Sequence, residues 1–271
     1  MTETRQVNGV DVFIEGEGAQ TIVMIHGWPD THRLWDSTVQ ALQGHYRCVR
    51  FTLPGFDAGQ PRRSFSIPQL VATFRSIVEQ TCPGQQVILM LHDWGCAFGY
   101  AFAAQHPALV SKIVGVDIGD AGSRAHLRSL RARDKLMIAA YQGWLAIAWR
   151  IGGRAGESMT HGMARALRCP SDPAFIGSQM NYPYHLQCSG AGAQPGAAAF
   201  VPACPMLYVY GTKKPFMFHS PTWAEALAKQ PGCQVLAFET GHWVMNRRPE
   251  PFNQAVLAWL GRAPNHLACE T

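Results

Sequence analysis

The alternation of short apolar runs with segments of helical periodicity is the feature that most constrains the fold of this chain. The expected strands are a pair within 7–15, TIVMIHG (21–27), a strand inside 46–59, QVILMLHDWG (86–95), VSKIVGVDIG (110–119), a strand inside 204–215 and CQVLAFETGH (233–242). The expected helices are 32–42, 67–80, 96–107, 221–230 and 249–260. Strands that alternate with helices along a chain form parallel sheets with helices on both faces. The sequence therefore predicts an α/β fold with a doubly wound, mostly parallel sheet.

One long interruption of this alternation predicts an inserted segment. Between residues 121 and about 203 the pattern becomes helix-like, with a loop rich in Gly and Ala. We expect residues 1–120 and 204–271 to form the core, and residues 121–203, named the cap segment from here on, to form an inserted helical cap. The apolar stretch Leu136 to Trp149 is too short to span a bilayer, so we expect no membrane span and a buried helix at this place.

Charge and cysteine content exclude several classes of function. The Lys and Arg residues behind the net charge of +5 are scattered, and the pairs in PRRS and NRRP fit solvated turns better than a nucleic-acid surface. The eight cysteines include no C-x-x-C pair, and no spacing of His and Cys fits zinc. We therefore expect reduced thiols and neither a metal nor a cofactor. The first residues lack a basic stretch followed by an apolar one, so we expect no signal peptide and a cytoplasmic location.

LMLHDWGCAFGY (89–100) places a carboxylate where an apolar strand turns into a helix. Ligands of such folds bind at the carboxyl ends of the strands, and a tight strand-to-helix turn holds one side chain exposed at the top of the sheet. The helix that follows offers N–H donors and a positive dipole to an anion. Asp93 therefore fits the position of a nucleophile, and the alternative is an acid that only caps the helix.

Two further motifs give Asp93 a family context. HGWPD (26–30) follows an earlier strand, and TGHWV (240–244) places His242 in the loop after the last strand. The chain resembles the α/β-hydrolase fold over nearly its full length. The three motifs in this order resemble the branch of epoxide hydrolases and haloalkane dehalogenases, whose nucleophile is Asp. The first Gly of the usual G-x-nucleophile-x-G pattern is Leu91 here.

The resemblance implies a role for each motif. Asp93 is expected to attack the substrate and His242 to act as the base. The backbone N–H groups of Trp28 and Trp94 are expected to form the oxyanion hole, with both indoles lining the site. His92 is expected to be structural, because the elbow geometry points its side chain away from the substrate.

The sequence motifs identify the acid that orients His242 less directly than they identify Asp93 and His242. Many α/β-hydrolases carry it after the strand that follows the cap, as G-x-x-D, but the corresponding segment here is YGTKKP, with Lys214 in place of the Asp. The strand before the cap ends VGVDIGD, at a place where some dehalogenase relatives carry their acid. We therefore assign Asp117 as the orienting acid, with Asp120 as the alternative.

The leaving atom of the substrate separates the two activities of the branch. A carboxylate is ionised at neutral pH and suits displacement at a saturated carbon, through an alkyl–enzyme ester that water activated by His242 then hydrolyses. An alkoxide leaving group needs proton donors, and epoxide hydrolases supply them with two cap tyrosines. The candidates here are Tyr141 and, in NYPYH, Tyr184 or Tyr182. A halide needs only weak donors such as indoles.

Both activities stay open, with hydrolysis of an epoxide to a vicinal diol favoured. Tyr141 lies 48 residues after Asp93, similar to the first cap tyrosine of epoxide hydrolases, and Trp28 stands where some dehalogenases carry Asn. Trp144 and Trp149 offer indoles for a halide instead, and the elbow and the early acid resemble dehalogenases. A non-catalytic ligand-binding protein of this fold is a third hypothesis. The expected partners are a small apolar epoxide, or an alkyl halide, and water, without nucleic acid; the oligomeric state is left open.

Overall fold

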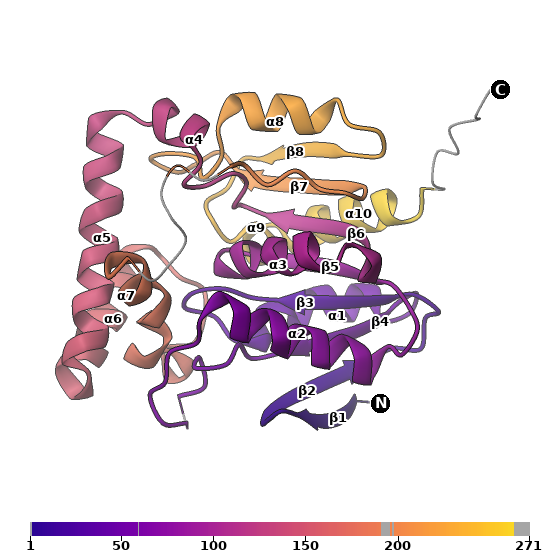
Figure 1. Cartoon of the computed structure of the whole chain (residues 1–271), viewed down its shortest axis with the longest axis horizontal. Coiled ribbons are helices and arrows are strands. Elements are labelled where there is room, and N and C mark those ends of the chain that lie inside the picture. Colours follow the sequence, from indigo (N-terminus) through magenta and orange to yellow (C-terminus); the bar gives the residue numbers. More distant parts are fainter. Residues whose placement is uncertain (1, 59, 191–195, 197, 263–271) are drawn as a thin grey trace.

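An eight-stranded sheet runs through the described part of the chain, which is residues 2–58, 60–190, 196 and 198–262 of the computed structural model (Figure 1). The strands are β1 (Thr2–Val7), β2 (Val10–Glu15), β3 (Thr21–Ile25), β4 (Arg47–Phe51), β5 (Val87–His92), β6 (Val110–Val116), β7 (Met206–Gly211) and β8 (Gln234–Phe238). Their order in the sheet is β1-β2-β4-β3-β5-β6-β7-β8. β1 and β4 pair antiparallel with β2, and the other pairs are parallel. The predicted mostly parallel sheet is confirmed.

Helices cover both faces of the sheet, because successive residues of each strand point to opposite sides. The helices on one side are α2 (Ile67–Thr81), α3 (Trp94–Gln105) and α8 (Pro221–Ala228). Those on the other side are α1 (Asp36–Leu42), α9 (Val244–Arg247) and α10 (Pro249–Leu260). In β3, Val23 and Ile25 face the first group, whereas Ile22 and Met24 face the second. Both faces are apolar, which explains why the central strands read as unbroken apolar runs.

The helices of the cap segment lie between β6 and β7 in the chain and at one end of the sheet, on the left in Figure 1. They are α4 (Arg124–Ser129), α5 (Ala132–Ile151), α6 (Gly153–Ala166) and α7 (Tyr182–Cys188). The 3₁₀ helices of the described residues are η1 (His32–Trp35), η2 (Pro107–Leu109), η3 (Pro173–Phe175) and η4 (Ser178–Asn181). Part of the predicted Gly- and Ala-rich loop, 191–195 and 197, lies outside the described residues, as does 263–271 of the predicted core. The predicted boundaries of the cap segment stay a prediction.

Two local predictions need correction. The strand pair expected within 7–15 is a longer hairpin of β1 and β2, which turns at Asn8 and Gly9, both with positive φ. An Asn-Gly pair is typical of such two-residue turns. The helix expected to be buried at 136–149 is α5, and that expectation is wrong for its outer side, where Leu136 and Ile147 are exposed. Among the described residues, no helix combines the length and apolar character needed to cross a bilayer.

Candidate active site

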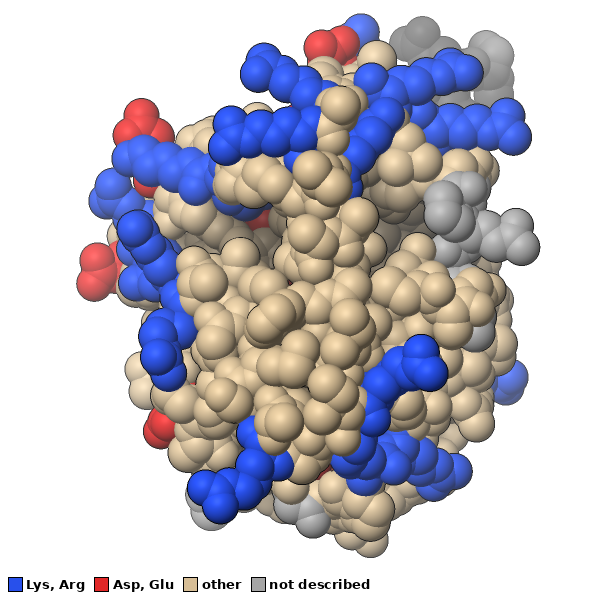
Figure 2. Space-filling view, turned by 90° about the vertical axis from the view of Figure 1, so that its left-hand side faces the viewer, with Lys and Arg blue, Asp and Glu red and all other residues tan. Residues whose placement is uncertain are grey.

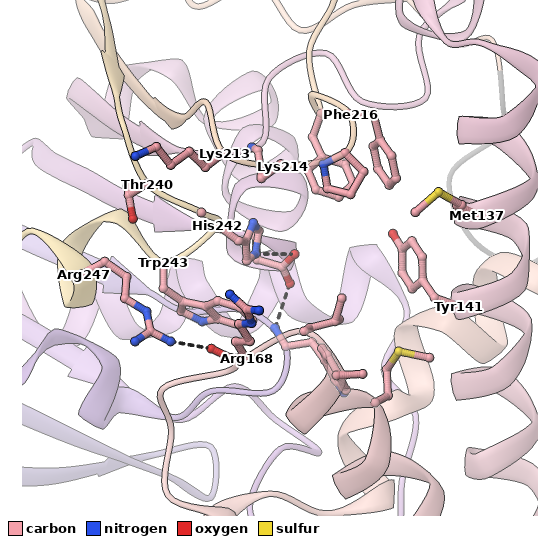
Figure 3. Close-up of a pocket in the computed structure, with 18 of the residues that line it drawn as sticks. Met137, Tyr141, Arg168, Lys213, Lys214, Phe216, Thr240, His242, Trp243 and Arg247 are labelled. Atoms are coloured by element: carbon pink, nitrogen blue, oxygen red, sulfur yellow. Dashed lines mark hydrogen bonds and ion pairs between the residues drawn. The ribbon is translucent and has the colours of Figure 1, made fainter.

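Five loops meet at the carboxyl edge of the sheet, beside the switch in strand order between β4, β3 and β5. They follow β3, β5, β6, β7 and β8, and they carry Trp28, Asp93, Asp117, Lys214 and His242, in that order. Between these loops and the cap helices lies a cavity of about 1050 Å³, lined by Trp28, Asp93 and His242 from the sheet side and by Tyr141 and Tyr184 from the cap side. Figure 3 shows Tyr141 of α5 facing His242 across this space.

Asp93 forms a strained turn between β5 and α3, with φ of 52° and ψ of −124°. A positive φ is uncommon for a residue with a Cβ and is held only where the surroundings fix it. Two glycines allow this packing. A Cβ on Gly27 would lie 2.5 Å from the Cβ of Asp93, and one on Gly95 would lie 2.3 Å from the carbonyl oxygen of Ile25. Backbone therefore packs directly against backbone at this corner.

The carboxylate of Asp93 faces the cavity and does not cap the helix. It stands at the N-cap position of α3 without a side-chain capping bond. Instead, its Oδ1 accepts the backbone N–H of Trp28 at 2.8 Å, and its Oδ2 lies 3.4 Å from Nε2 of His242. Burial favours a higher pKa for Asp93, but His242 and the Trp28 N–H outweigh it and lower that pKa below its usual value. The group is therefore ionised at neutral pH. The backbone nitrogen of Trp94 lies at the same corner, beside Gly27.

Asp117 connects His242 to a buried lysine. Its Oδ2 is paired with Nδ1 of His242, and its Oδ1 accepts from both Lys214 and the backbone N–H of Gly211. The carboxylate is fully buried, yet Lys214 and His242 hold its pKa below the usual value against the effect of burial. Asp120, the alternative acid, is engaged elsewhere: it accepts from the hydroxyl of Ser123 and from both the backbone and the hydroxyl of Ser220.

The two carboxylates on either side of His242 determine its charge. Burial favours a lower pKa for His242, but Asp117 and Asp93 raise it from 6.5 to about 9. The ring is therefore protonated at neutral pH while both carboxylates are ionised. His92 lies behind it, with ring centroids 4.5 Å apart, and burial lowers the pKa of His92 to about 3. His92 is fully buried and does not line the cavity.

The tyrosines of the cap segment differ in their position. Tyr141 and Tyr184 both line the cavity, and the ring of Tyr184 makes edge contacts with those of Trp28, Trp94 and Tyr141. Burial raises the pKa of both hydroxyls, which keeps them protonated. Tyr182 lies outside the cavity, where its ring packs on Phe56 and Phe65.

The indole N–H groups that line the cavity already have acceptors. Nε1 of Trp28 donates to Oδ1 of Asn181 at 2.6 Å, that of Trp144 to the carbonyl of Met159 at 3.1 Å, and that of Trp243 to Asp30 at 3.0 Å. Trp94 and Trp149 are not among the residues that line the cavity. The ring of Trp94 makes an edge contact with that of Tyr184, and Trp149 stacks on His185. A leaving halide would thus compete with existing acceptors.

Asp30 is a buried acid to which the sequence reasoning gave no role, although HGWPD contains it. Its carboxylate accepts from Nε1 of Trp243 and from the hydroxyl of Ser171, and burial raises its pKa to about 6. The carboxylate therefore ties the loop after β3 to the residue that follows His242 and to the cap segment. The only sequence signal for it was its place in the motif.

The apolar walls of the cavity also had no distinct sequence signal. Their large side chains come from α5, α6 and the loop after β7; they are Met137, Met163, Leu167, Phe216 and Phe218. Within the described part of the chain, no group of three or more His, Cys, Asp or Glu side chains is arranged to hold a metal ion. The seven described cysteines are free thiols, and Cys269 lies outside the described residues.

Comparisons with known proteins add the family context. A family model described as "Alpha/beta hydrolase family" matches residues 22–255. The chain is 22% identical over 264 residues to "Epoxide hydrolase 1" of Caenorhabditis elegans, in a match that covers 89% of this chain and 65% of that protein. It is 31% identical over 94 residues to "Probable oxidoreductase EphD" of Mycobacterium tuberculosis, covering 32% of this chain and 16% of that protein. The chain thus spans less than two thirds of these curated relatives.

A solved structure extends the likeness to nearly the whole fold. The epoxide hydrolase from Bacillus megaterium, in complex with an inhibitor, superposes with a TM-score of 0.72 at 18% sequence identity. The superposition covers 96% of this chain and 100% of that one. At this identity the match establishes a shared architecture.

Proposed function

The chain belongs to the α/β-hydrolase family, and we propose that within this family it is an epoxide hydrolase that uses Asp93 as its nucleophile. One observation carries the proposal. The ionised carboxylate of Asp93 shares a cavity with the two protonated hydroxyls of Tyr141 and Tyr184, whereas the indole donors of the cavity have other acceptors. An epoxide oxygen needs a proton donor as its carbon–oxygen bond breaks, and a halide does not.

In the first step, a carboxylate oxygen of Asp93 attacks one carbon of the epoxide ring. The electron pair of the broken carbon–oxygen bond moves to the epoxide oxygen, which takes a proton from a tyrosine hydroxyl. The products are an alkyl–enzyme ester and a free hydroxyl group on the alkyl chain. Tyr141 and Tyr184 act as the donors, and the protonated His242 is the source that restores the proton lost by the tyrosine.

In the second step, the now neutral His242 takes a proton from water, and the hydroxide attacks the carboxyl carbon of Asp93. The backbone N–H groups of Trp28 and Trp94 stabilise the oxyanion, in the role that preorganised backbone donors have in acyl transfer. Collapse of the tetrahedral intermediate breaks the bond between the carboxyl carbon and the alkyl oxygen. The leaving alkoxide takes the remaining proton of the attacking water, and the diol is released. Asp93 is left as a carboxylate that contains one oxygen from water. His242 is protonated again, as in the resting enzyme, so the protons balance over the cycle.

Lys214 offsets the negative charge of Asp117, which would otherwise raise the pKa of His242 further. In the resting site, the two carboxylates face two cations, Lys214 and His242. When Asp93 becomes an ester, one negative charge disappears, and the remaining carboxylate, Asp117, is already paired with Lys214. A neutral His242 then fits the site best, because loss of a nearby opposite charge lowers the pKa of a histidine. Alkylation thus converts His242 into the base that the second step requires.

We propose a small apolar epoxide as the substrate, because Met, Leu and Phe side chains line the cavity beside Asp93, His242 and the two tyrosines. Charged side chains also line it; they are Arg168, Lys213, Lys214, Glu239 and Arg247. Water is the second substrate. The location in the cytoplasm stays a prediction from the sequence.

A panel of substrates tests the proposal. Purified protein is incubated with styrene oxide and with a fatty epoxide, and formation of the diol is measured; 1-bromobutane serves as the competing substrate, with bromide release as the readout. We expect diols and no bromide. Bromide release without diol would identify a haloalkane dehalogenase, and binding of these compounds without turnover would identify a ligand-binding protein of this fold.

A further inference from the structure

The outer side of α5 is apolar although nothing in the described part of the chain covers it. Leu136, Ala140, Trp144, Ile147 and Ile151 recur at intervals of three or four residues, which places them on one face of the helix, and all five are exposed. Leu136, Ile147 and Ile151 are each more than half exposed, at 71%, 52% and 56%. A helix that is apolar on all sides is normally buried, and a contiguous exposed apolar patch marks an interaction surface.

The positive charge of the chain is concentrated in the same segment. Residues 121–203 contain nine Lys and Arg against three Asp and Glu, a net charge of +6, while the rest of the sequence contains 14 and 15, a net charge of −1. Cations stand at both ends of the apolar stripe; they are Arg131, Arg133 and Lys135 before it and Arg150 and Arg154 at its far end, and all are exposed. Figure 2 shows this face, with an uncharged area bordered mainly by Lys and Arg.

The apolar stripe continues into the mouth of the cavity. Ala140 and Trp144 belong to the stripe and also line the cavity. Other exposed residues that line it are Leu167 and Arg168 at the end of α6, and Lys213, Glu239 and Arg247 from the sheet side. Whatever covers the stripe therefore lies next to an exposed part of the cavity lining. A protein bound there would cover the entrance, whereas the acyl region of a lipid layer is a reservoir from which an apolar compound enters directly.

We propose that the outer face of α5 binds the surface of a bilayer that contains anionic phospholipid, with the cavity mouth turned toward the lipid. Apolar side chains on one face of a helix and Lys and Arg at its borders are the features of segments that lie in the membrane interface without spanning it. A second copy of the chain is a poor occupant, because two cap segments with a net charge of +6 each would repel.

Sedimentation with vesicles tests this proposal without any turnover. The Asp93→Asn protein is mixed with vesicles of phosphatidylcholine and phosphatidylglycerol, and with vesicles of phosphatidylcholine alone. We expect binding to the anionic vesicles that weakens as salt is added, because salt screens exposed charges. Absence of binding to anionic vesicles, or equal binding to both kinds with no dependence on salt, would overturn the proposal.

Two double variants locate the surface. Ile147→Ser with Ile151→Ser removes apolar contacts, and Arg150→Glu with Arg154→Glu reverses charges; none of these residues lines the cavity. Each pair is expected to weaken binding by about tenfold or more. Lys229→Glu, on the exposed end of α8 outside the cap segment, is the matched control and is expected to bind as the parent does. Unchanged binding in both pairs would overturn the assignment of this face, and so would a concentration-dependent dimer that both pairs abolish.

Diol formation in the same variants, made with Asp93 intact, separates this proposal from the proposed function. With a water-soluble epoxide and no vesicles, the surface variants are expected to keep the parent's rate, which also shows that they fold. Delivery of an apolar epoxide from vesicles rests on the proposed epoxide chemistry, whereas vesicle binding does not. If the protein binds vesicles and forms no diol, the membrane proposal stands and the proposed function is wrong. If it forms diol and does not bind vesicles, the proposed function stands and the membrane proposal is wrong.

Discussion

Lys214 donates to Oδ1 of Asp117, the carboxylate oxygen that His242 does not use. The lysine is 6% exposed and the aspartate is fully buried, so the pair is formed inside the protein. A cation thus stands after β7, where the resemblance to the family led us to look for the acid, and it contacts Asp117 after β6, the carboxylate that is paired with His242. This arrangement explains how the position after β7 can carry Lys while His242 is still paired with a carboxylate.

Replacing Lys214 tests its proposed role in the second step. In Lys214→Met, Asp117 keeps its charge without a counter-ion other than His242, so the pKa of His242 in the alkyl–enzyme is expected to rise. A rise of about one unit would leave roughly a tenth of the neutral base at a given pH. Intact-protein mass spectrometry during turnover should then show alkylated enzyme, in an amount that falls as the pH is raised. Lys214→Arg keeps the charge and should restore hydrolysis of the ester. A methionine variant without accumulated ester and with the parent's pH profile would show that the lysine has no such role.

The stability of the fold should depend on the charge of His242. Its pKa is 6.5 in the unfolded chain and about 9 in the folded one, where Asp117 and Asp93 outweigh the effect of burial. A group whose pKa is raised in the folded state stabilises the fold fully at pH values below its unfolded pKa. This stabilisation is lost as the pH rises through its folded pKa. This contribution, on the order of 3 kcal/mol, is therefore expected at pH values below 6.5 and lost between 6.5 and about 9.

Urea unfolding at a series of pH values measures this dependence, and His242→Gln is the comparison. The parent should lose free energy of unfolding relative to the variant across that window. Parallel curves for the two proteins would mean that the carboxylates do not bind the imidazolium as strongly as the geometry indicates.

Three tyrosines of the cap segment allow a comparison of matched Tyr→Phe variants. Tyr141→Phe and Tyr184→Phe each remove a hydroxyl from the cavity and should slow epoxide opening by about tenfold or more, since loss of general acid catalysis costs at least that much. Tyr182→Phe removes a buried hydroxyl outside the cavity and serves as the control with nearly the parent's rate. The rate of ester formation in a single turnover measures epoxide opening in each variant. A large loss in the Tyr182 variant alone would reverse the assignment of the two neighbouring tyrosines.

Gly27 is expected to tolerate no side chain. A Cβ there would lie 2.5 Å from the Cβ and Oδ1 of Asp93 and from the backbone nitrogen of Trp94, so Gly27→Ala must displace the nucleophile or the oxyanion donors. A displacement of about 1 Å can cost roughly a hundredfold in rate. Gly44→Ala is the control, because no atom lies within 4 Å of its added Cβ. Steady-state rates of diol formation compare the two, and equal rates would show that the corner is less rigid than its packing implies.

Much of the fold could be predicted from sequence because its central strands are buried on both faces. Such strands read as apolar runs, and the loops at their carboxyl ends must gather at one edge of the sheet. That geometry, together with the resemblance to the family, predicted Asp93, His242 and Asp117 at one site, with Asp120 as the alternative acid, and the structure brings the first three into contact. The predicted α/β-hydrolase family is confirmed by the family model that spans residues 22–255.

The remaining features depend on packing that a local pattern does not contain. Tyr182 and Tyr184 flank one proline, and only the orientation of α7 decides which ring reaches the cavity. Apolar residues on every side of α5 do not reveal that one side is left uncovered. Asp30 meets Trp243 across more than two hundred residues of sequence, so no spacing rule could join them.

The central claim is that Asp93 forms a covalent ester with the substrate. Its most direct test is a single turnover, with enzyme in excess over epoxide, in water labelled with the heavy oxygen isotope. Water attacks the carboxyl carbon in the proposed mechanism, so the label is expected in the peptide that contains Asp93, and the diol is expected to carry an unlabelled oxygen from the enzyme. Label in the diol with none at Asp93 would contradict the account, because water would then have attacked the epoxide directly.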